Sequence, residues 1–326
     1  MPSPTINQVH VAGPLDNISV AYVQDAEEFI ATKAFHPVPV PKQSDLYYTY
    51  DKGDFLRDGA QLRGPGAESA GGGYDLDHTR NYYCPVYAYH KDVADQIREN
   101  SDAVLDDDRD ATIFVTQKML IKRELLFVNS AWGLGIWSTD RTGVPAAPGA
   151  TQFLQWDAAA SDPGVDIDAA KTTAKLLSGF RPNVMIVGEQ VHDTLKRHTI
   201  IRDQYKYTSG ANVTKSNLAS YFEVDEYLVG GAIQNTAVAG AVDVIAAMYG
   251  KACLLVYRPA APGKLIPASG YAFNWRGKGG NMPNGMQISK FRRSPEFRAD
   301  RVEGEMATDF RVVATDTGVF MTTAIS

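Results

Sequence analysis

The six histidines of the chain are the side chains best suited to act as acids, bases or metal ligands near neutral pH. They are His10, His36, His78, His90, His192 and His198. His192 and His198 fall within one predicted helix, but a separation of six residues directs them to nearly opposite faces, so they do not form a metal pair. The sequence contains neither an H-E-x-x-H zinc motif nor a G-x-S-x-G nucleophile elbow. We therefore expect no catalytic residue and no metal site.

Three further segments have the composition of ligand loops, and each lacks a required residue. A phosphate loop at Gly277–Gly280 would need a glycine separated by four residues from the Gly-Lys pair and a hydroxyl residue after it, but Ala272 and Gly279 occupy those positions. Gly133–Gly135 lacks the third glycine of a dinucleotide site and follows a predicted helix instead of a strand. The acidic run Asp106–Asp110 lacks the glycine and distal glutamate of a calcium loop, and fits a helix N-terminus better. No cofactor is expected.

The bulk composition is that of an ordinary folded protein, with 44% hydrophobic and 21% charged residues. The net charge of -6 argues against a general binder of polyanions and suits a wall that does not adhere to enclosed nucleic acid. Cys84 and Cys253 lie far apart and predict buried, reduced thiols. Met1–His10 has no signal-peptide pattern, and Tyr227–Gly250 is too rich in Gly and Ala for a membrane span, so we expect a cytoplasmic origin and no membrane contact.

The first 45 residues have the composition of an arm. Asp25–Phe35 predicts a short helix capped by Asp25. The run His36–Pro41 alternates proline with Val38 and Val40, which favours an extended edge segment laid along another element, such as a neighbouring chain.

Residues 46–90 predict a projecting hairpin. Leu46–Tyr50 and Tyr82–Tyr89 are aromatic-rich and typical of strands. Residues 59–73 between them contain six glycines and little that could fill a core. Loops of this length are uncommon unless they are functional or disordered, and a mobile surface loop is the alternative interpretation.

The strongest helix signal follows Asp106–Asp110, whose acids favour a helix N-terminus. Apolar residues then recur on one predicted face, at Phe114, Ile121, Leu125, Val128 and Trp132. Gly133 predicts its end. A helix of about 25 residues would be ~37 Å long, which predicts a structural spine.

The rest of the chain predicts a mixed α/β region. Residues 138–165 suggest a hairpin or linker. The expected helices are 166–177, 190–201 and 216–221, and the expected strands are 183–188, 226–233, 252–257, 310–314 and 318–322. The whole chain is therefore predicted to be an α+β protein.

Two segments carry opposite charge. Residues 91–110 hold eight acids and three bases, and residues 264–301 hold eight bases and two acids. They are either two separate solvated faces or segments that meet, within one chain or across subunits.

The order of these parts resembles the major capsid proteins of tailed bacteriophages, which have the Hong Kong 97 fold shared with encapsulins. The similar segments are NISVAYV (17–23), FIATKAF (29–35), the Pro-Val-Pro-Val run, YHKDV (89–93), NVMIVGEQVH (183–192) and VDEYLVGGAI (224–233). The resemblance implies an N-terminal arm at 1–45 and an extended loop at 46–90. It also implies a peripheral domain at 91–164 and 301–326 with the spine helix, and an α/β axial domain at 165–300.

The function implied by this resemblance is assembly of pentamers and hexamers into an icosahedral shell that encloses packaged double-stranded DNA in a virion assembled in the host cytoplasm. Scaffolding, portal and cement or decoration proteins are implied partners, with non-specific contact to DNA. The residues that we expect at subunit interfaces are Val38, Val40, Tyr48, Tyr50, Gly64, Gly66, Gly72, Tyr87, Asp107, Asp108, Arg292 and Arg293. The alternatives are an encapsulin-like nanocompartment, a soluble α/β enzyme with an unfamiliar site, and a smaller phage structural part such as a decoration or tail protein.

Overall fold

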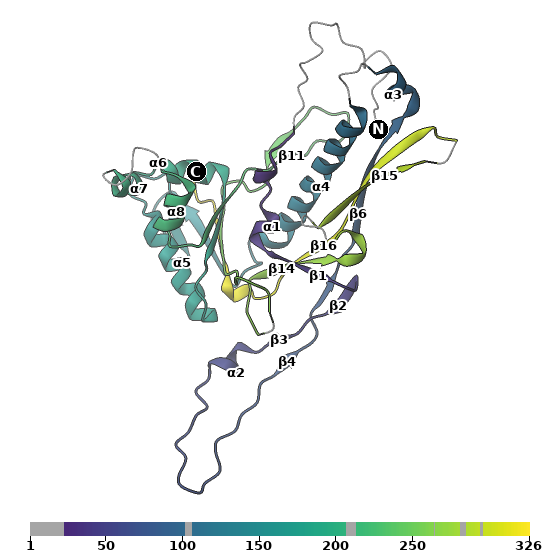
Figure 1. Ribbon diagram of the computed structural model, residues 1–326. Coiled ribbons are helices and arrows are strands. Elements are labelled where there is room, and N and C mark those ends of the chain that lie inside the picture. Colours follow the sequence, from purple (N-terminus) through teal and green to yellow (C-terminus); the bar gives the residue numbers. More distant parts are fainter. Residues whose placement is uncertain (1–22, 102–105, 207–212, 264, 281–284, 294–295) are drawn as a thin grey trace.

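The computed structural model describes residues 23–101, 106–206, 213–263, 265–280, 285–293 and 296–326. Two sheets, a long helix and a projecting loop dominate it (Figure 1). The helical segments are η3 (Ala26–Glu28), α1 (Ala31–Ala34), α2 (Lys52–Leu56), α3 (Asp95–Asn100), α4 (Asp107–Ala131), α5 (Pro163–Ser178), α6 (Glu189–Arg197), α7 (Thr199–Tyr205), α8 (Lys215–Tyr221), η4 (Arg276–Lys278) and η5 (Thr315–Thr317). The strands are β1 (His36–Val40), β2 (Ser44–Leu46), β3 (Thr49–Tyr50), β4 (Leu76–Asp77), β5 (Asn81–Tyr83), β6 (Val86–Ala94), β7 (Thr139–Val144), β8 (Gln152–Leu154), β9 (Val184–Gly188), β10 (Glu226–Gly230), β11 (Ile233–Asn235), β12 (Ile245–Ala247), β13 (Cys253–Val256), β14 (Gly270–Trp275), β15 (Met286–Arg292), β16 (Ala299–Val312) and β17 (Val319–Thr322).

The five-stranded sheet is organised around β16, a strand of 14 residues. The first half of β16 lies between β6 and β15, both antiparallel to it, and its second half pairs with β14. β1 runs parallel to β14 at the edge, with Val38 opposite Phe273 and Val40 opposite Trp275. The predicted extended edge segment is confirmed, and its pairing partner is a strand of the same chain. Since Pro37 and Pro39 carry no N–H, this edge of the sheet is poorly suited to pairing with a further strand.

The six-stranded sheet has the order β10-β9-β13-β17-β7-β8 and separates two hydrophobic cores. Successive side chains of a strand point to opposite faces, so Met185 and Val187 of β9 enter the core covered by α5, α6 and α8. Val184 and Ile186 enter the other core, which contains Phe127 of α4. Burial on both faces explains why every residue of β9 is buried.

Helix α4 covers the five-stranded sheet and has the predicted length of 25 residues. The predicted buried face is wrong in part, because Phe114 is 41% exposed. The residues that are buried are Ala111, Val115, Met119, Arg123, Glu124, Phe127 and Ala131. The helix approaches β16 closely at Gly304, where a Cβ atom would lie 2.8 Å from Cγ1 of Val115. Four of the five predicted positions lie directly beside a buried residue and are not buried themselves.

Three local predictions are corrected by the structure. Residues 138–165 do not form a hairpin, because β7 and β8 pair in parallel and β7 also pairs in parallel with β17. The helix predicted at 190–201 is interrupted at His198, which has an extended ψ of 131° and directs its ring to the Ser161 hydroxyl. The helix predicted at Asp25–Phe35 is divided into η3 and α1, because Phe29 has an extended ψ of 108°. The helices predicted at 166–177 and 216–221 are confirmed as α5 and α8, and α5 ends at Gly179 with a φ of 82°.

Each of the two sheets contains strands from both of the residue ranges that were expected to form separate domains. β7, β8 and β17 lie in the same sheet as β9, β10 and β13, although 139–154 and 319–322 were expected with the spine helix. β14 and β15 lie in the five-stranded sheet with β16. The chain thus crosses between the sheets several times, which composition along the sequence does not reveal.

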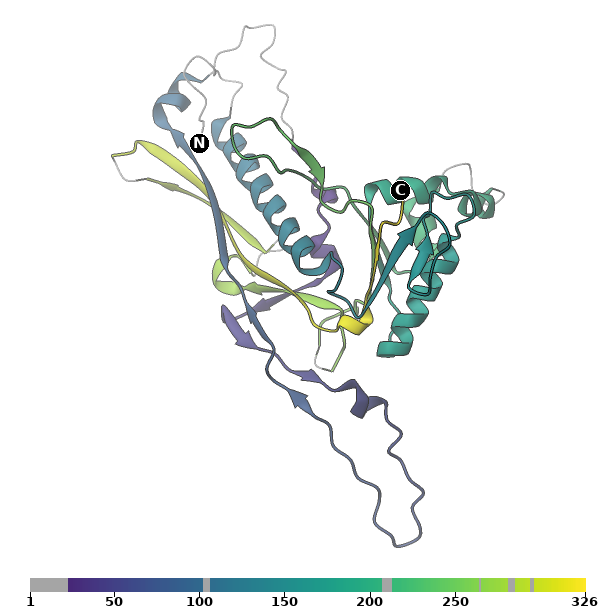
Figure 2. The same cartoon turned by 180° about the vertical axis from the view of Figure 1, so that it is seen from behind.

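The projecting loop runs from β2 to β5 and extends away from both sheets (Figures 1 and 2). β2 pairs with β5 and β3 with β4, so the two sides of the loop meet only near its base. The expected strand at 82–89 is divided at Cys84-Pro85 into β5 and β6. Among the described residues, no helix has the length and apolar composition needed to cross a bilayer.

Candidate subunit-contact surfaces

The projecting loop exposes large apolar side chains that its own subunit does not cover. No residue from 41 to 81 is buried, and Tyr48 is 64% exposed. Tyr50, Phe55 and Tyr74 pack on one another with ring centroids 5.6–5.8 Å apart. A contact of three exposed rings cannot replace a core, because stability requires apolar surface to be removed from water. The loop therefore presents an apolar surface suited to burial against a partner.

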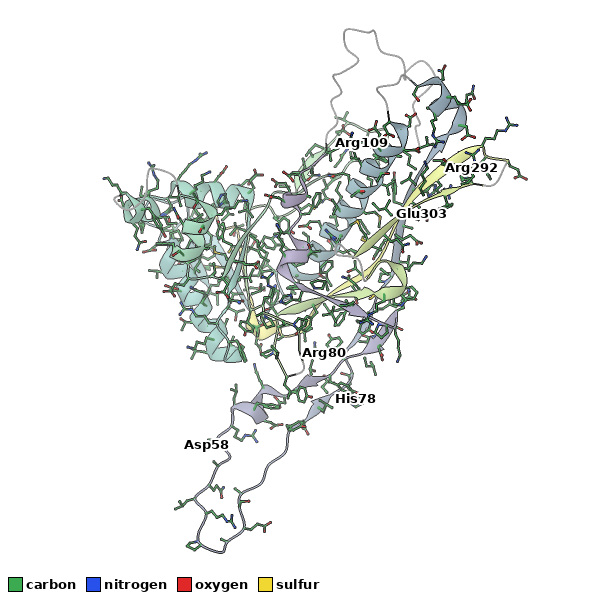
Figure 3. All side chains as sticks on the ribbon, in the orientation of Figure 1. Asp58, His78, Arg80, Arg109, Arg292 and Glu303 are labelled. Carbon is green, nitrogen blue, oxygen red and sulfur yellow. The ribbon has the colours of Figure 1, made fainter. Side chains whose placement is uncertain are left out.

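The glycine-rich tip of the loop is open on all sides. A Cβ atom added at Gly66 or Gly72 would meet nothing within 4 Å, and one at Gly64 would meet only the Ala67 methyl group at 4.0 Å. Gly66 alone of the three has a positive φ, of 78°. Figure 3 shows that the side chains along the two sides of the loop are widely spaced, with Asp58, His78 and Arg80 labelled there.

The base of the loop is attached to the body of the subunit. Lys52 donates to the backbone carbonyl of Leu177 at 3.2 Å and forms an ion pair with Asp316. On the other side, Tyr82 stacks on Phe273 with ring centroids 4.6 Å apart. The base is thus fixed in direction while the tip remains free.

The arm segment is held by a buried carboxylate of the long helix. Glu124 is fully buried, and its two oxygens accept hydrogen bonds from the backbone N–H groups of Ile30 at 2.8 Å and Ala31 at 3.1 Å. The Tyr249 hydroxyl also donates to it. Burial raises the pKa of Glu124, and these three donors oppose that rise. We name Glu124 with its three donors the arm clasp, because it joins the arm, α4 and the segment before β13.

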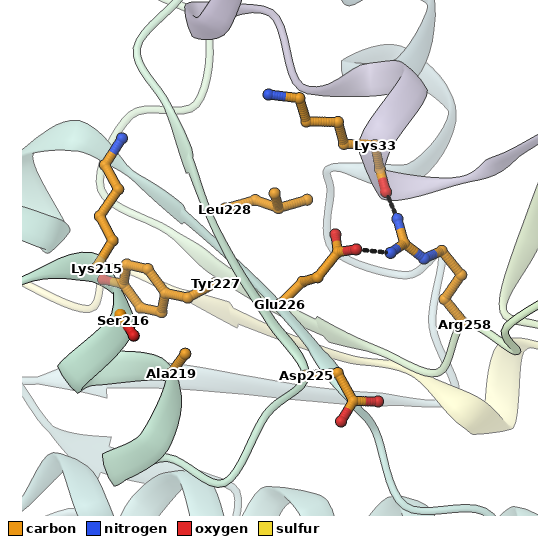
Figure 4. Close-up of a pocket in the computed structure, with 9 residues that line it drawn as sticks. All are labelled: Lys33, Lys215, Ser216, Ala219, Asp225, Glu226, Tyr227, Leu228 and Arg258. Carbon is orange, nitrogen blue, oxygen red and sulfur yellow. Dashed lines mark hydrogen bonds and ion pairs between the residues drawn. The ribbon is translucent and has the colours of Figure 1, made fainter.

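A second contact ties the arm helix α1 to the six-stranded sheet, beside a shallow pocket (Figure 4). Arg258 donates to the backbone carbonyl of Lys33 and pairs with Glu226 of β10. An active site would need titratable groups that converge on a bound substrate. Here Arg258 and Glu226 neutralise one another, so their arrangement supports attachment of the arm.

The acidic and basic segments meet within one chain, as one of the two interpretations predicted. Asp92 accepts from Nε of Arg301 at 2.7 Å and from Arg293 at 2.7 Å, and the Arg301 bond is the main cause of its lowered pKa. Asp108 pairs with Lys290 at 2.7 Å, while Arg292 pairs with Asp95 and Asp300.

Four of the residues expected at subunit interfaces therefore already have partners in their own subunit. They are Asp107, which accepts from Ser101 at 2.6 Å, Asp108, Arg292 and Arg293. Val40 is also buried, in a cluster with Tyr82 and Phe273. Tyr48, Tyr50 and the loop glycines remain exposed. Their contact with another subunit stays a prediction.

The side chains that could in principle take part in catalysis or metal binding form contacts within the fold. His192 lies 3.1 Å from the Tyr227 hydroxyl and His198 lies 3.1 Å from the Ser161 hydroxyl, and burial lowers the pKa of both imidazoles. Lys278 contacts both oxygens of Glu305, at 2.8 and 2.9 Å. Both cysteines are free and buried, as predicted. In the part of the chain that the structure describes, no group of three His, Cys, Asp or Glu side chains is arranged to hold a metal ion.

No protein-family model matches the chain. A stretch of 128 residues, 38% of this chain, is 31% identical to a protein named major capsid protein of Burkholderia phage BcepMu, and it spans 40% of that relative's length. A phage-related protein from Bordetella bronchiseptica RB50 superimposes with a TM-score of 0.68 at 18% identity, over 92% of this chain and 94% of that one. A chain of Microbacterium phage Oxtober96 gives a TM-score of 0.57 at 12% identity, covering 96% of each chain. The capsid of cyanophage P-SCSP1u gives 0.54 at 10% identity, covering 87% of this chain and 84% of that one.

The chain has the Hong Kong 97-like capsid fold. The resemblance to phage major capsid proteins that the order of parts indicated is confirmed, since a curated relative carries that name. The predicted mixture of helices and strands is confirmed as well.

Within the Hong Kong 97-like fold, two attachments were missed by reasoning from the sequence. Glu124 follows Lys122 and Arg123 in a charged stretch of α4, and Lys52 lies in the projecting loop, so neither stood out as a contact. No sequence signal distinguishes Glu124 from these charged neighbours. No sequence signal links Lys52 to Asp316, which is 264 residues away.

Proposed function

We propose that the chain is the major capsid protein of a tailed phage, which assembles as pentamers and hexamers into an icosahedral head around packaged double-stranded DNA. The observation that carries the proposal is the projecting loop with its exposed aromatic and aliphatic side chains, set on a capsid-type fold. A loop with so little core of its own gains stability by burying these side chains against a neighbouring subunit. The name of the curated relative supports the same role.

In this proposal the parts have distinct positions in the shell. The arm comprises residues up to about 43 and the extended loop residues 44–83. The peripheral domain is the five-stranded sheet with α4, and the axial domain is the six-stranded sheet with α5–α8. These bounds follow sheet membership, and they are proposed beside the ranges 1–45, 46–90, 91–164 with 301–326, and 165–300 that the resemblance implies. The role is structural and has no catalytic step.

The proposed location is the virion, after assembly in the host cytoplasm. Scaffolding, portal and cement or decoration proteins are the proposed partners, and contact with packaged DNA is non-specific. The phage reading is preferred to a nanocompartment because the similarity is greater to the phage-related protein, at a TM-score of 0.68, than to the virus-like particle of Pyrococcus furiosus, at 0.50.

The test is assembly of the full chain, expressed alone and with its neighbouring genes, followed by sedimentation velocity and negative-stain microscopy. We expect closed shells, tubes or capsomer rings. A small monomer or dimer under both conditions would refute the proposal. Shells that enclose a co-expressed enzyme, and that form beside no portal or terminase gene, would favour a nanocompartment instead.

A further inference from the structure

Three lysines converge on one exposed face, where α4 lies along β6 (Figure 1). Lys91 of β6 and Lys118 of α4 place their ammonium groups 5.6 and 5.5 Å from the ring centroid of Phe114. Lys122, one helical turn after Lys118, lies 4.8 Å from the ring centroid of Tyr87. We call Lys91, Lys118 and Lys122 with these two rings the lysine strip.

Ion pairs with the described residues do not neutralise the lysine strip. Among the described residues, none of its three ammonium groups lies within 4.0 Å of a carboxylate. The opposite face of the same sheet behaves differently, because Asp92 neutralises Arg293 and Arg301 there. The nearest acid along the same row of α4 is Asp110, one turn before Phe114, and no ion pair joins it to the strip.

The aromatic rings explain how the strip is held ready for a ligand. A cation over a ring face is attracted by the ring quadrupole, so Phe114 and Tyr87 restrict where the lysine side chains move. The entropy lost on binding an anion is then smaller than for free surface lysines. This arrangement would explain why Phe114, an apolar residue, is 41% exposed on the helix surface.

We propose that the lysine strip binds the phosphate backbone of double-stranded DNA. The inference rests on the proposed function, and it names the surface through which the shell contacts its contents. A phosphate contact needs only a point charge, which each ammonium group supplies, and the strip contains no Arg, Asn or Gln, whose planar paired groups are best suited to reading base edges. An acidic polypeptide is the competing ligand. The net charge of -6 keeps each contact weak, and many copies in a shell would add their effects.

The test compares the wild type with the triple variant Lys91→Gln, Lys118→Gln, Lys122→Gln. A labelled 30-base-pair duplex is titrated with the full chain at 50–200 mM NaCl, with sedimentation recorded in parallel. The matched control is Lys196→Gln, Arg197→Gln, Arg202→Gln, which removes the same charge from exposed residues of α6 and α7 that lie over no ring of a described residue. Three phosphate contacts predict a loss of affinity of roughly 40-fold in the wild type over this salt range.

We expect the strip variant to lower the slope of log affinity against log salt by about 3, and the control variant to change it by less than about 1. Equal slopes in wild type and strip variant would overturn the inference, as would an equal loss in the control. Competition by polyglutamate as effective as that by unlabelled duplex would assign the strip to an acidic polypeptide instead. Sedimentation reports separately on shell formation, so a wild type that binds DNA without assembling would refute the proposed function and leave this inference standing.

Discussion

Glu124 is the residue on which the position of the arm depends most directly. Its carboxylate is the shared acceptor for two backbone N–H groups of the arm and for the Tyr249 hydroxyl. None of these donors has access to water as a substitute partner, because Ile30, Ala31 and Tyr249 are all buried. Buried donors that lose their acceptor carry a full desolvation cost.

Glu124→Ala is expected to lower the free energy of unfolding by about 3 kcal/mol or more, since three buried donors lose their partner. Tyr249→Phe should cost only about 1 kcal/mol, because the carboxylate keeps both backbone donors. Urea denaturation of the full chain measures both values. The matched control is Glu303→Ala, whose side chain is half-buried on the other face of the sheet. An effect of Glu124→Ala no larger than that of Glu303→Ala would show that the clasp does not stabilise the arm.

His198 makes stability depend on pH. Burial lowers the pKa of its imidazole, so the folded state holds the neutral form where the unfolded chain already binds a proton. Stability is therefore fully present above the unfolded pKa of about 6.5 and is lost as pH falls through the lower folded value. Asp162 opposes the shift, and Ser161 accepts or donates at 3.1 Å.

We expect His198→Gln to flatten the decline of stability below pH 6.5, measured by urea denaturation at half-unit pH steps. His78→Gln, in the exposed part of the loop, should leave the decline unchanged. Curves for His198→Gln and wild type that stay parallel from pH 7 to 5 would contradict a role for this histidine.

At the scale of elements, the loop is separable from the fold. Replacing residues 59–73 by a short Gly-Ser link removes a segment without a buried residue, so the unfolding midpoint should change by less than about 2 °C. Shell formation should be lost, because in the proposed shell the loop covers a neighbouring subunit. Circular dichroism melting and negative-stain microscopy measure the two effects. Normal particles from this deletion would show that the tip is not an assembly contact.

The limits of the helix and loop predictions have a common physical cause. Asp106 as a cap and a run without Gly or Pro determine where α4 lies, and both are local signals. Which face it buries depends on partners distant in sequence, such as Gly304 and the arm. For that reason Phe114 was expected on the buried face, and the contact of Glu124 with the arm was not expected.

Strand pairing shows the same division between local and distant information. β9 is recognisable because both of its faces are buried, which gives an unbroken apolar run. Most of β16 was missed because Gly304 and several charged residues interrupt its alternation. The contact between the oppositely charged segments is one of the two interpretations that the sequence left open, since charge complementarity acts whatever the separation in sequence.

At the scale of the whole molecule, the loop and the body should respond differently to assembly. Residues 57–75 lie outside any strand pairing, so their backbone amides are expected to exchange with deuterium at nearly unfolded rates in the free subunit. In assembled particles we expect protection of these amides, while β9 stays protected in both states. Hydrogen exchange with mass spectrometry measures both. Rapid exchange of 57–75 in particles would contradict burial of the loop between subunits.

The pairing of β1 with β14 has a consequence for timing. In the five-stranded sheet, His36 of β1 lies opposite Tyr271 of β14. In the six-stranded sheet, β17 lies between β13 and β7 and comprises residues 319–322 of the 326-residue sequence. Neither sheet can close until the ribosome has made β16 and β17, which end at Val312 and Thr322. At about 5–20 residues per second, the stretch from residue 85 to 322 takes roughly 12–48 s. During that interval the aromatic loop has been synthesised but has no finished body to which it is attached. A nascent chain therefore exposes the loop to aggregation throughout this interval, and chaperone dependence should follow the rate of translation beyond residue 84.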